Sequence, residues 1–190
     1  MSASPYSIIN LEQGSNEWLE WRQKGIGASD APSIMGKSTR KSADELLRQK
    51  RGPAIDYGLN AATARGLILE PEAREHYMLK TGIKVEPACL QSVQYPWLRA
   101  SVDGLSTCGS YVVEIKCGKS IYDEAFQIKR VPGHYYGQLQ HILAVTGLDA
   151  IDFWCYLPKR QAILLHVDRN VHYIEELLQA EFRFWQLMLV

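Results

Sequence analysis

In the N-terminal part of the chain, apolar residues recur at the spacing of amphipathic helices. Gly25 and Gly82 each follow such a segment and supply a helix stop. Ser42 and Glu45 stand three residues apart in the pattern of a capping box, which predicts a helix start. Pro71 lies inside the longest segment and allows a bend there. We therefore predict helices over residues 16–24, from a Ser29-Asp30 cap to Met35, over 43–50 and over 60–80.

After Gly82 the apolar residues no longer follow a helical spacing, and β-branched and aromatic residues become frequent. Residues 111–117 (YVVEIKC) make the strongest strand, and turn residues over 105–110 join it to the preceding strand as a hairpin. Gly147 closes a further helix. The predicted strands span 85–93, 97–102, 111–117, 151–157 and 162–167, and the later helices span 134–146 and 171–189. This order predicts an α/β (α+β) fold with a central mixed β-sheet flanked by helices, in a single domain over residues 1–190.

Composition is that of a soluble globular protein, with 46% apolar and 22% charged residues. No run approaches the roughly 18–20 apolar residues that a membrane span needs. The first residues lack the basic and apolar regions of a signal peptide, so we expect a cytoplasmic protein. The four cysteines form no CxxC pair, which gives a zinc site or an iron–sulfur cluster little support and predicts free thiols.

The charges balance, with 21 Lys and Arg against 21 Asp and Glu. Phosphate binding favours positive charge, so a nucleic-acid partner needs a local basic surface. One short stretch offers it through Lys37, Arg40, Lys41, Arg48, Lys50 and Arg51. We predict that Lys41, Arg48 and Arg51, on or beside the 43–50 helix, touch DNA; the alternative is a solvated helix face.

Candidate chemistry centres on the strand over 111–117. Residues two apart in a strand face the same side, so Glu114 and Lys116 share one face. Asp103 ends the preceding strand, and pairing of the two strands would bring its carboxylate to that of Glu114. Close carboxylates repel each other, whereas Mg²⁺ would bind oxygen ligands such as Asp103, Glu114 and the Ile115 carbonyl. The tripeptide alone leaves open a plain solvated Glu–Lys pair.

A divalent cation at this place suits phosphodiester hydrolysis. It neutralises the phosphate, lowers the pKa of bound water and stabilises the departing oxyanion. Lys116 would lie beside the attacking water or the phosphate, where its charge stabilises the transition state. The pattern therefore predicts a magnesium-dependent nuclease.

The spacing of Asp103 and Glu114-Ile115-Lys116 resembles the core of PD-(D/E)XK nucleases, with Val102 in place of the proline. Four other segments resemble the lambda-exonuclease or YqaJ-type viral recombinase family, in the family's order and over residues 18–147. They are Trp21-Arg22 with Gly-Ile-Gly-Ala-Ser29-Asp30, Gly66-x-x-x-Glu70-Pro-x-Ala-Arg74, Ala-Ser101-Val-Asp103-Gly and Tyr136-Gly-Gln138-Leu-Gln140. The resemblance implies a restriction-endonuclease-like core.

The resemblance also implies roles for individual residues. Asp103 and Glu114 match metal ligands, and Lys116 matches a catalytic lysine. Glu70 matches a helical carboxylate near the metals, and Gln138 a glutamine that aligns the catalytic face. The implied cofactor is Mg²⁺, as two ions, with Mn²⁺ able to substitute.

A pocket for a 5′-phosphate is implied as well, formed by Arg22, Ser29, Ser101 and Gln138. Arginine offers planar bidentate donors, and Ser29 at a helix start adds a hydroxyl and backbone N–H groups. The structural alternative is that Arg22 pairs with Glu20 or Asp30. We expect Trp18 and Trp21 in the core, and His141 as a satisfied, non-catalytic histidine.

The leading hypothesis is a processive 5′→3′ double-stranded DNA exonuclease of phage or prophage type in a bacterial host cell. It would leave 3′ single strands for a single-strand annealing protein, and the family implies a homotrimeric ring around DNA. The alternatives are a structure-specific or restriction-type endonuclease and a non-catalytic DNA-end binding module. A cysteine hydrolase using Cys117 and His141 is a further one, and it requires a lowered thiol pKa.

Overall fold

The computed structural model describes residues 4–53 and 61–190. The strands are β1 (Tyr6–Ile9), β2 (Ile26–Gly27), β3 (Val85–Ser92), β4 (Leu98–Ser106), β5 (Val112–Cys117), β6 (Ala150–Tyr156) and β7 (Ile163–Asp168). The helices are α1 (Asn16–Gln23), the 3-10 turn η1 (Ala28–Asp30), α2 (Ala31–Ile34), α3 (Ala43–Arg51), α4 (Ala61–Thr81), α5 (Lys119–Ile128), α6 (Gly133–Thr146) and α7 (Val171–Met188). None of the described helices is long and apolar enough to cross a membrane.

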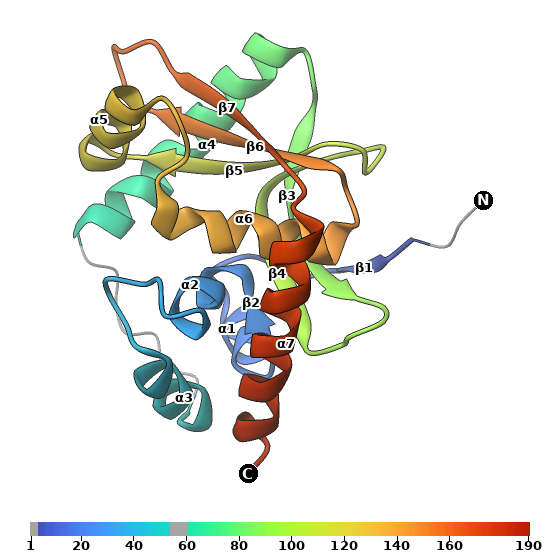
Figure 1. The fold of residues 1–190 in the computed structure, drawn as a ribbon. Helices are drawn as coiled ribbons and strands as arrows, with labels where there is room; N and C mark the ends of the chain where they lie inside the picture. Colours follow the sequence, from blue (N-terminus) through green and yellow to red (C-terminus); the bar gives the residue numbers. More distant parts are fainter. Residues whose placement is uncertain (1–3, 54–60) are drawn as a thin grey trace.

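The seven strands of the described residues join one sheet, in the order β1-β3-β4-β5-β6-β7, with β2 beside β4. The pairs β2–β4 and β5–β6 are parallel and the others antiparallel. The predicted mixed sheet is therefore confirmed, and it is mostly antiparallel. In Figure 1, α6 crosses one face of this sheet, and α1, α2, α3 and α7 gather below it.

Each face of the sheet has its own apolar core. On one face, Ala73 and Tyr77 of α4 pack against Val113 and Ile115 of β5 and Trp154 of β6. On the other, Leu139 and Ile142 of α6 and Ile174 of α7 belong to the same core cluster as Val112 of β5 and Phe153 of β6. Because side chains alternate along a strand, β5 contributes to both cores. Glu114 and Lys116 therefore lie on a covered face of the sheet, which argues against the alternative of a plain solvated Glu–Lys pair.

Local signals place several helix ends where the sequence predicts them. The Ser42 hydroxyl and the Glu45 carboxylate form the predicted capping box of α3. Gly147 ends α6 in the left-handed region, with φ of 71°. Pro71 is inside α4, and the predicted first residue of that helix, Asn60, lies outside the described residues.

The structure also differs from the prediction. The strand expected over 97–102 continues to Ser106, so Asp103 lies within β4 and not at its end. The short strands β1 and β2 and the helix α5 were not predicted. Helix α5 begins directly after Gly118, whose φ of 141° turns the chain out of β5 without any side-chain cap.

Candidate active site

The site begins where β4 and β5 part. These strands pair at two positions, Gly104 with Val113 and Leu105 with Val112. Two residues beyond Val113 along β5, the N–H of Ile115 donates to Asp103 Oδ2 at 2.7 Å. A side-chain carboxylate thus takes the place that a backbone carbonyl would hold in a continued ladder. This hydrogen bond fixes Asp103 beside the middle of β5.

Glu114 is the buried centre of the site. Its side chain is 2% exposed, and its Oε1 accepts a hydrogen bond from Gln138 Nε2 of α6 at 2.6 Å. The same oxygen forms an ion pair with Lys116 Nζ. The ammonium of Lys116 also lies 5.4 Å from the ring centroid of Tyr135. The structure thereby brings together the predicted Glu114, Lys116 and Gln138.

Negative charge is crowded around Glu114. Burial and the neighbouring Asp103 raise the pKa of Glu114 to about 7. Burial also raises the pKa of Asp103. For Glu70 of α4, burial and Asp103 raise the pKa to about 6. Burial alone would lower the pKa of Lys116, but the carboxylates of Glu114 and Asp103 outweigh it and raise that pKa, which keeps the ammonium charged.

The donor set favours a hard cation at Asp103 and Glu114. Glu114 Oε2 is buried and has no hydrogen-bond partner among the described residues. Glu70 pairs with Arg74, whose Nε donates to the Asp103 carbonyl at 2.7 Å. With these side-chain positions, residues 4–53 and 61–190 contain no group of three His, Cys, Asp or Glu that could hold a metal ion. Two carboxylates and an unsatisfied oxygen nevertheless suit a cation that also binds water and carbonyl oxygens.

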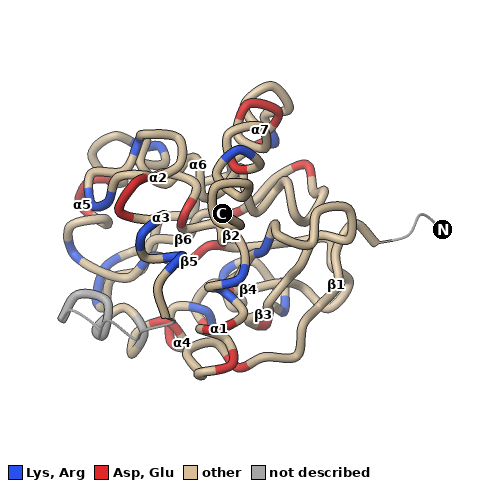
Figure 2. The backbone as a smooth tube through the Cα atoms, turned by 90° about the horizontal axis from the view of Figure 1, so that it is seen from below, with Lys and Arg blue, Asp and Glu red and all other residues tan. Residues whose placement is uncertain are grey.

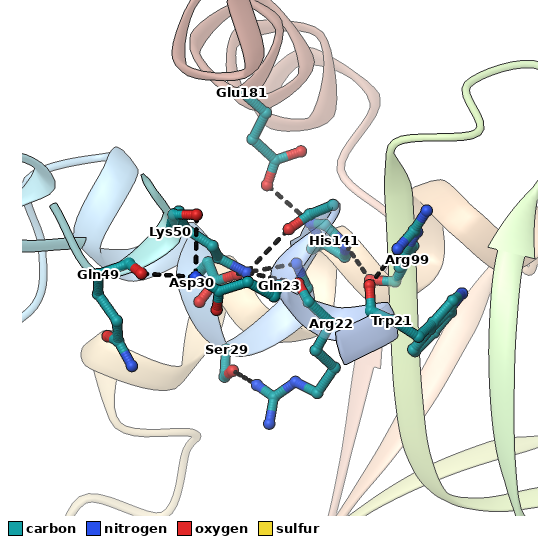
Figure 3. A network of polar contacts seen from close by, with 12 residues as sticks. Trp21, Arg22, Gln23, Ser29, Asp30, Gln49, Lys50, Arg99, His141 and Glu181 are labelled. Carbon is teal, nitrogen blue, oxygen red and sulfur yellow. Dashed lines mark hydrogen bonds and ion pairs between the residues drawn. The ribbon is translucent and has the colours of Figure 1, made fainter. Parts of the chain in front are cut away.

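A cationic pocket adjoins the carboxylates. The guanidinium of Arg22 donates from Nη2 to Ser29 Oγ at 2.7 Å, which Figure 3 shows, and its Cζ lies 4.5 Å from the ring centroid of Trp18. Trp18 Nε1 donates to Ser101 Oγ at 2.8 Å. Three of the four predicted phosphate ligands are therefore linked: Ser29 contacts Arg22 directly, and Ser101 is joined to Arg22 through the indole of Trp18.

One cavity of about 150 Å³ joins the two halves of the site. Its lining contains Asp103, Glu114 and Gln138 together with Arg22, Ser29 and Ser101. A second cavity of about 320 Å³ shares Arg22 and Ser29 with it and is lined by Arg40 and Lys41. Seen from below in Figure 2, Lys and Arg segments gather around α3, β4 and β5, the elements that border this region.

The predicted DNA-contacting residues do not form one surface. Lys41 lines the larger cavity, and Arg48 is exposed on α3. Arg51 donates to the Leu187 carbonyl near the end of α7, with Nη2 at 2.6 Å. Lys50, counted with the basic stretch in the sequence, is buried and pairs with Asp30 at 2.7 Å. The basic stretch therefore supplies both surface charge and internal structure.

Sequence reasoning missed part of the cavity wall. Trp18 and Trp21, expected in the core, are half-buried and line the cavity together with Gln13 and Arg99. The prediction of core tryptophans is wrong because α1 rests on the edge of the site and not on the sheet centre. A tryptophan four residues before an arginine, at helical spacing, was the available signal for the contact between Trp18 and Arg22.

The structure argues against cysteine chemistry. Burial raises the pKa of the Cys117 thiol to about 12, the reverse of what a thiolate nucleophile needs. His141 is fully buried, with Nδ1 2.6 Å from Glu181 Oε1 and Nε2 2.8 Å from the Arg99 carbonyl. Both ring nitrogens are thus occupied, as expected for a structural histidine.

Comparison with known proteins agrees with this geometry. A family model described as the YqaJ-like viral recombinase domain matches residues 17–149. The uncharacterized protein YqaJ of Bacillus subtilis (strain 168) is 28% identical in an alignment of 181 positions that covers 93% of this chain and 57% of that protein. The chain thus spans little more than half the length of this curated relative.

Crystal structures of exonucleases share the fold. LHK-Exo, an alkaline exonuclease from Laribacter hongkongensis, gives a TM-score of 0.81 at 25% identity, with 92% of each chain covered. Its complex with dAMP gives 0.80 at 27% identity, with the same coverage. A phage-related exonuclease from Haemophilus somnus 129PT gives 0.60 at 14% identity over 86% of this chain and 95% of that one, a likeness of fold alone.

These likenesses confirm the predicted fold class, a sheet and helices of the kind found in PD-(D/E)XK exonucleases. The matched family segment contains the carboxylates, the lysine and the cationic pocket within one stretch of chain. The chain belongs to the YqaJ-like viral recombinase family.

Proposed function

We propose that the protein is a metal-dependent exonuclease that degrades one strand of duplex DNA from a 5′-phosphorylated end. The observation that carries this proposal is the cavity of about 150 Å³ that joins Asp103 and Glu114 to Arg22, Ser29 and Ser101. A cavity of this kind can hold the terminal phosphate while the next phosphodiester lies at the carboxylates. Similarity to the alkaline exonuclease LHK-Exo supports the same assignment.

The cationic pocket would select the end of the strand. A terminal phosphate carries more negative charge than a phosphodiester, and a planar guanidinium donates to it through paired N–H groups. Arg22 is held for this task by the ring of Trp18 and by its hydrogen bond to Ser29. Ser101 adds a hydroxyl from β4, which is fixed by Trp18. A 5′-hydroxyl end would lack the charge that these donors recognise.

Asp103, Glu114 and the Ile115 carbonyl would hold Mg²⁺, with Glu70 nearby for a second ion, and Mn²⁺ would substitute. The buried, unpartnered Glu114 Oε2 and the raised pKa values of Glu114 and Asp103 support this, because a divalent cation offsets both burial and mutual repulsion. When bound, it supplies a water of lowered pKa and neutralises the charge of the phosphate.

The remaining residues would hold the carboxylates in place and stabilise negative charge at the phosphate. Gln138 holds the Glu114 carboxylate from α6 through a hydrogen bond of 2.6 Å. Lys116 keeps its proton, and its ammonium would stabilise negative charge at the scissile phosphate or orient the attacking water. Arg74 ties Glu70 of α4 to the backbone of Asp103, and so keeps α4 beside the site.

A role in recombination follows from a reaction that begins at a DNA end. Removal of one strand from its 5′ end leaves a 3′ single strand, the substrate of a single-strand annealing protein in recombination. With no net charge, one chain has little general attraction for DNA. A homotrimeric ring would place three copies each of Lys41 and Arg48 around one duplex and would support processive degradation. Light scattering at several concentrations tests the trimer.

The experiment that tests the proposed function is digestion of duplex DNA in Mg²⁺, with linear 5′-phosphorylated, linear 5′-hydroxyl and covalently closed circular substrates compared. We expect rapid loss of the phosphorylated duplex, slower loss of the hydroxyl duplex and intact circles, with a Lys116→Ala variant as the inactive control. Cutting of circles would instead identify an endonuclease. Binding of ends without nucleotide release would identify a binding module.

A further inference from the structure

A buried ammonium lies beside the proposed phosphate pocket, at the wall of the larger cavity that shares Arg22 and Ser29 with it. Lys50, in the last turn of α3, has a side chain that is only 6% exposed. Its Nζ lies 2.7 Å from Asp30 Oδ2 and 2.8 Å from each of the carbonyl oxygens of Arg22 and Gly25. An ammonium has three N–H donors, so all three are used inside the protein. Figure 3 shows this cluster next to the Arg22–Ser29 contact.

Helices α1 and α3 bind each other's C-terminal ends through side-chain hydrogen bonds, and Lys50 makes one half of these contacts. Lys50 of α3 donates to carbonyls at the C-terminal end of α1, where helical partners run out. In return, the side-chain amide of Gln23 of α1 shares its two N–H donors among the carbonyls of Gln49, Lys50 and Gly52 at the end of α3, with Nε2 at 2.6, 2.9 and 3.0 Å from them. Each helix thus satisfies the other's last carbonyls, which fixes their relative position.

Asp30 extends this arrangement to the other side of the pocket. Its carboxylate is almost fully buried, and Oδ2 also accepts from the Gly27 N–H at 2.9 Å. That hydrogen bond closes the turn that carries Ser29. Lys50 therefore holds the backbone of Arg22 directly and the turn of Ser29 through Asp30. These are the two groups that meet in the Arg22–Ser29 hydrogen bond.

We propose that Lys50 is a positioning residue for 5′-phosphate recognition, which it serves by holding Arg22 and the Ser29 turn in register while making no contact with the phosphate itself. This inference rests on the proposed function. A buried ion pair adds little net stability compared with apolar residues of the same size, but its directional contacts define one geometry. Misplacement of a binding group by about 1 Å can cost roughly 100-fold in rate.

The test uses the full chain with excess Mg²⁺ and compares initial rates on 5′-phosphorylated and 5′-hydroxyl linear duplex. In Lys50→Met we expect the ratio of the two rates to fall at least about tenfold, with the hydroxyl rate within about threefold of wild type. Arg48→Met is the matched control, because it removes one charge from the exposed side of the same helix. Arg48→Met should lower the rates on both substrates by the same factor and leave their ratio unchanged.

A second variant separates positioning from folding. Lys50→Met leaves the Asp30 carboxylate buried without its cation, which can unfold the protein. The double variant Asp30→Asn, Lys50→Met removes both charges, and the introduced amide oxygen can still accept from the Gly27 N–H. We expect the double variant to melt near the wild-type temperature and still to lose the phosphate preference. A preference retained by the folded double variant would overturn the role of Lys50. A wild-type protein without any preference would overturn the phosphate pocket itself.

Discussion

Replacing Glu114 with glutamine should stabilise the metal-free protein while it removes the proposed activity. The Glu114 side chain is 2% exposed, and its Oε2 has no partner among the described residues. Burial and Asp103 raise its pKa from 4.5 to about 7, so between these values the folded protein holds a proton that the unfolded chain releases. Stability of the metal-free protein therefore falls as the pH rises from about 4.5 to about 7.

The size of the effect follows from the same pKa. A rise from 4.5 to about 7, at about 1.4 kcal/mol per pH unit, lowers the free energy of unfolding by about 3 kcal/mol at pH 8.5. Glutamine has nearly the same shape, carries no charge and can still accept from Gln138. For a chain of 190 residues, we expect Glu114→Gln to raise Tm by roughly 6–12 °C at that pH.

Thermal melts in EDTA at pH 8.5 and pH 5.5 measure this. The difference should be large at pH 8.5 and shrink at pH 5.5, where wild-type Glu114 is itself protonated. Excess Mg²⁺ should stabilise the wild type, through binding to the folded state, and leave Glu114→Gln unchanged. Glu175→Gln, an exposed site on α7, is the control and should not change Tm. A Glu114→Gln protein that melts at or below the wild-type temperature in EDTA at pH 8.5 would refute the reasoning.

Three further substitutions address other parts of the molecule. Lys116→Met should lower the rate of duplex digestion by about 10²–10³ while DNA binding in a gel-shift assay is retained, and wild-type rates would contradict a catalytic role. Arg22→Met removes a charge-assisted contact of about 1.5–3 kcal/mol, so kcat/KM on 5′-phosphorylated ends should fall about 10–150-fold. The value of kcat/KM on 5′-hydroxyl ends should stay the same, and equal losses on both kinds of end would argue against the pocket. His141→Leu leaves the Glu181 carboxylate buried and unpaired, so calorimetry should show a loss of about 3–5 kcal/mol that His141→Leu, Glu181→Met together largely recover; a stable single variant would contradict this.

Features that depend on local periodicity were predictable from the sequence. Glu114 and Lys116 stand two apart in a β-branched strand, and the structure places them together on one face. The capping box at Ser42 and Glu45 sets the start of α3 as predicted. Glu70 and Gln138 required the family resemblance. Gln138 lies on a helix far along the chain from Glu114, which it contacts, and Glu70 is joined to β4 only through Arg74, which donates to the Asp103 carbonyl.

Features that depend on tertiary packing were not predictable. Lys50 and Arg48 look alike in a basic stretch, yet one is buried and the other exposed, because only Lys50 faces the end of α1. Helix α5 begins without a side-chain cap, and β1 is a four-residue edge strand with two exposed central positions. Neither has the pattern that identifies an isolated element. The extension of β4 through Asp103 depends on its pairing with β3.

The hydrogen bond from the Ile115 N–H to Asp103 affects how an inactive form of this protein should be made. In Asp103→Ala, that N–H would lose its acceptor at the point where β4 and β5 separate, so the variant would be altered in architecture as well as in chemistry. In Asp103→Asn, an amide oxygen can still accept from Ile115 while the charge is lost. For trapping a bound DNA end in crystals, asparagine is therefore the substitution that leaves the scaffold intact.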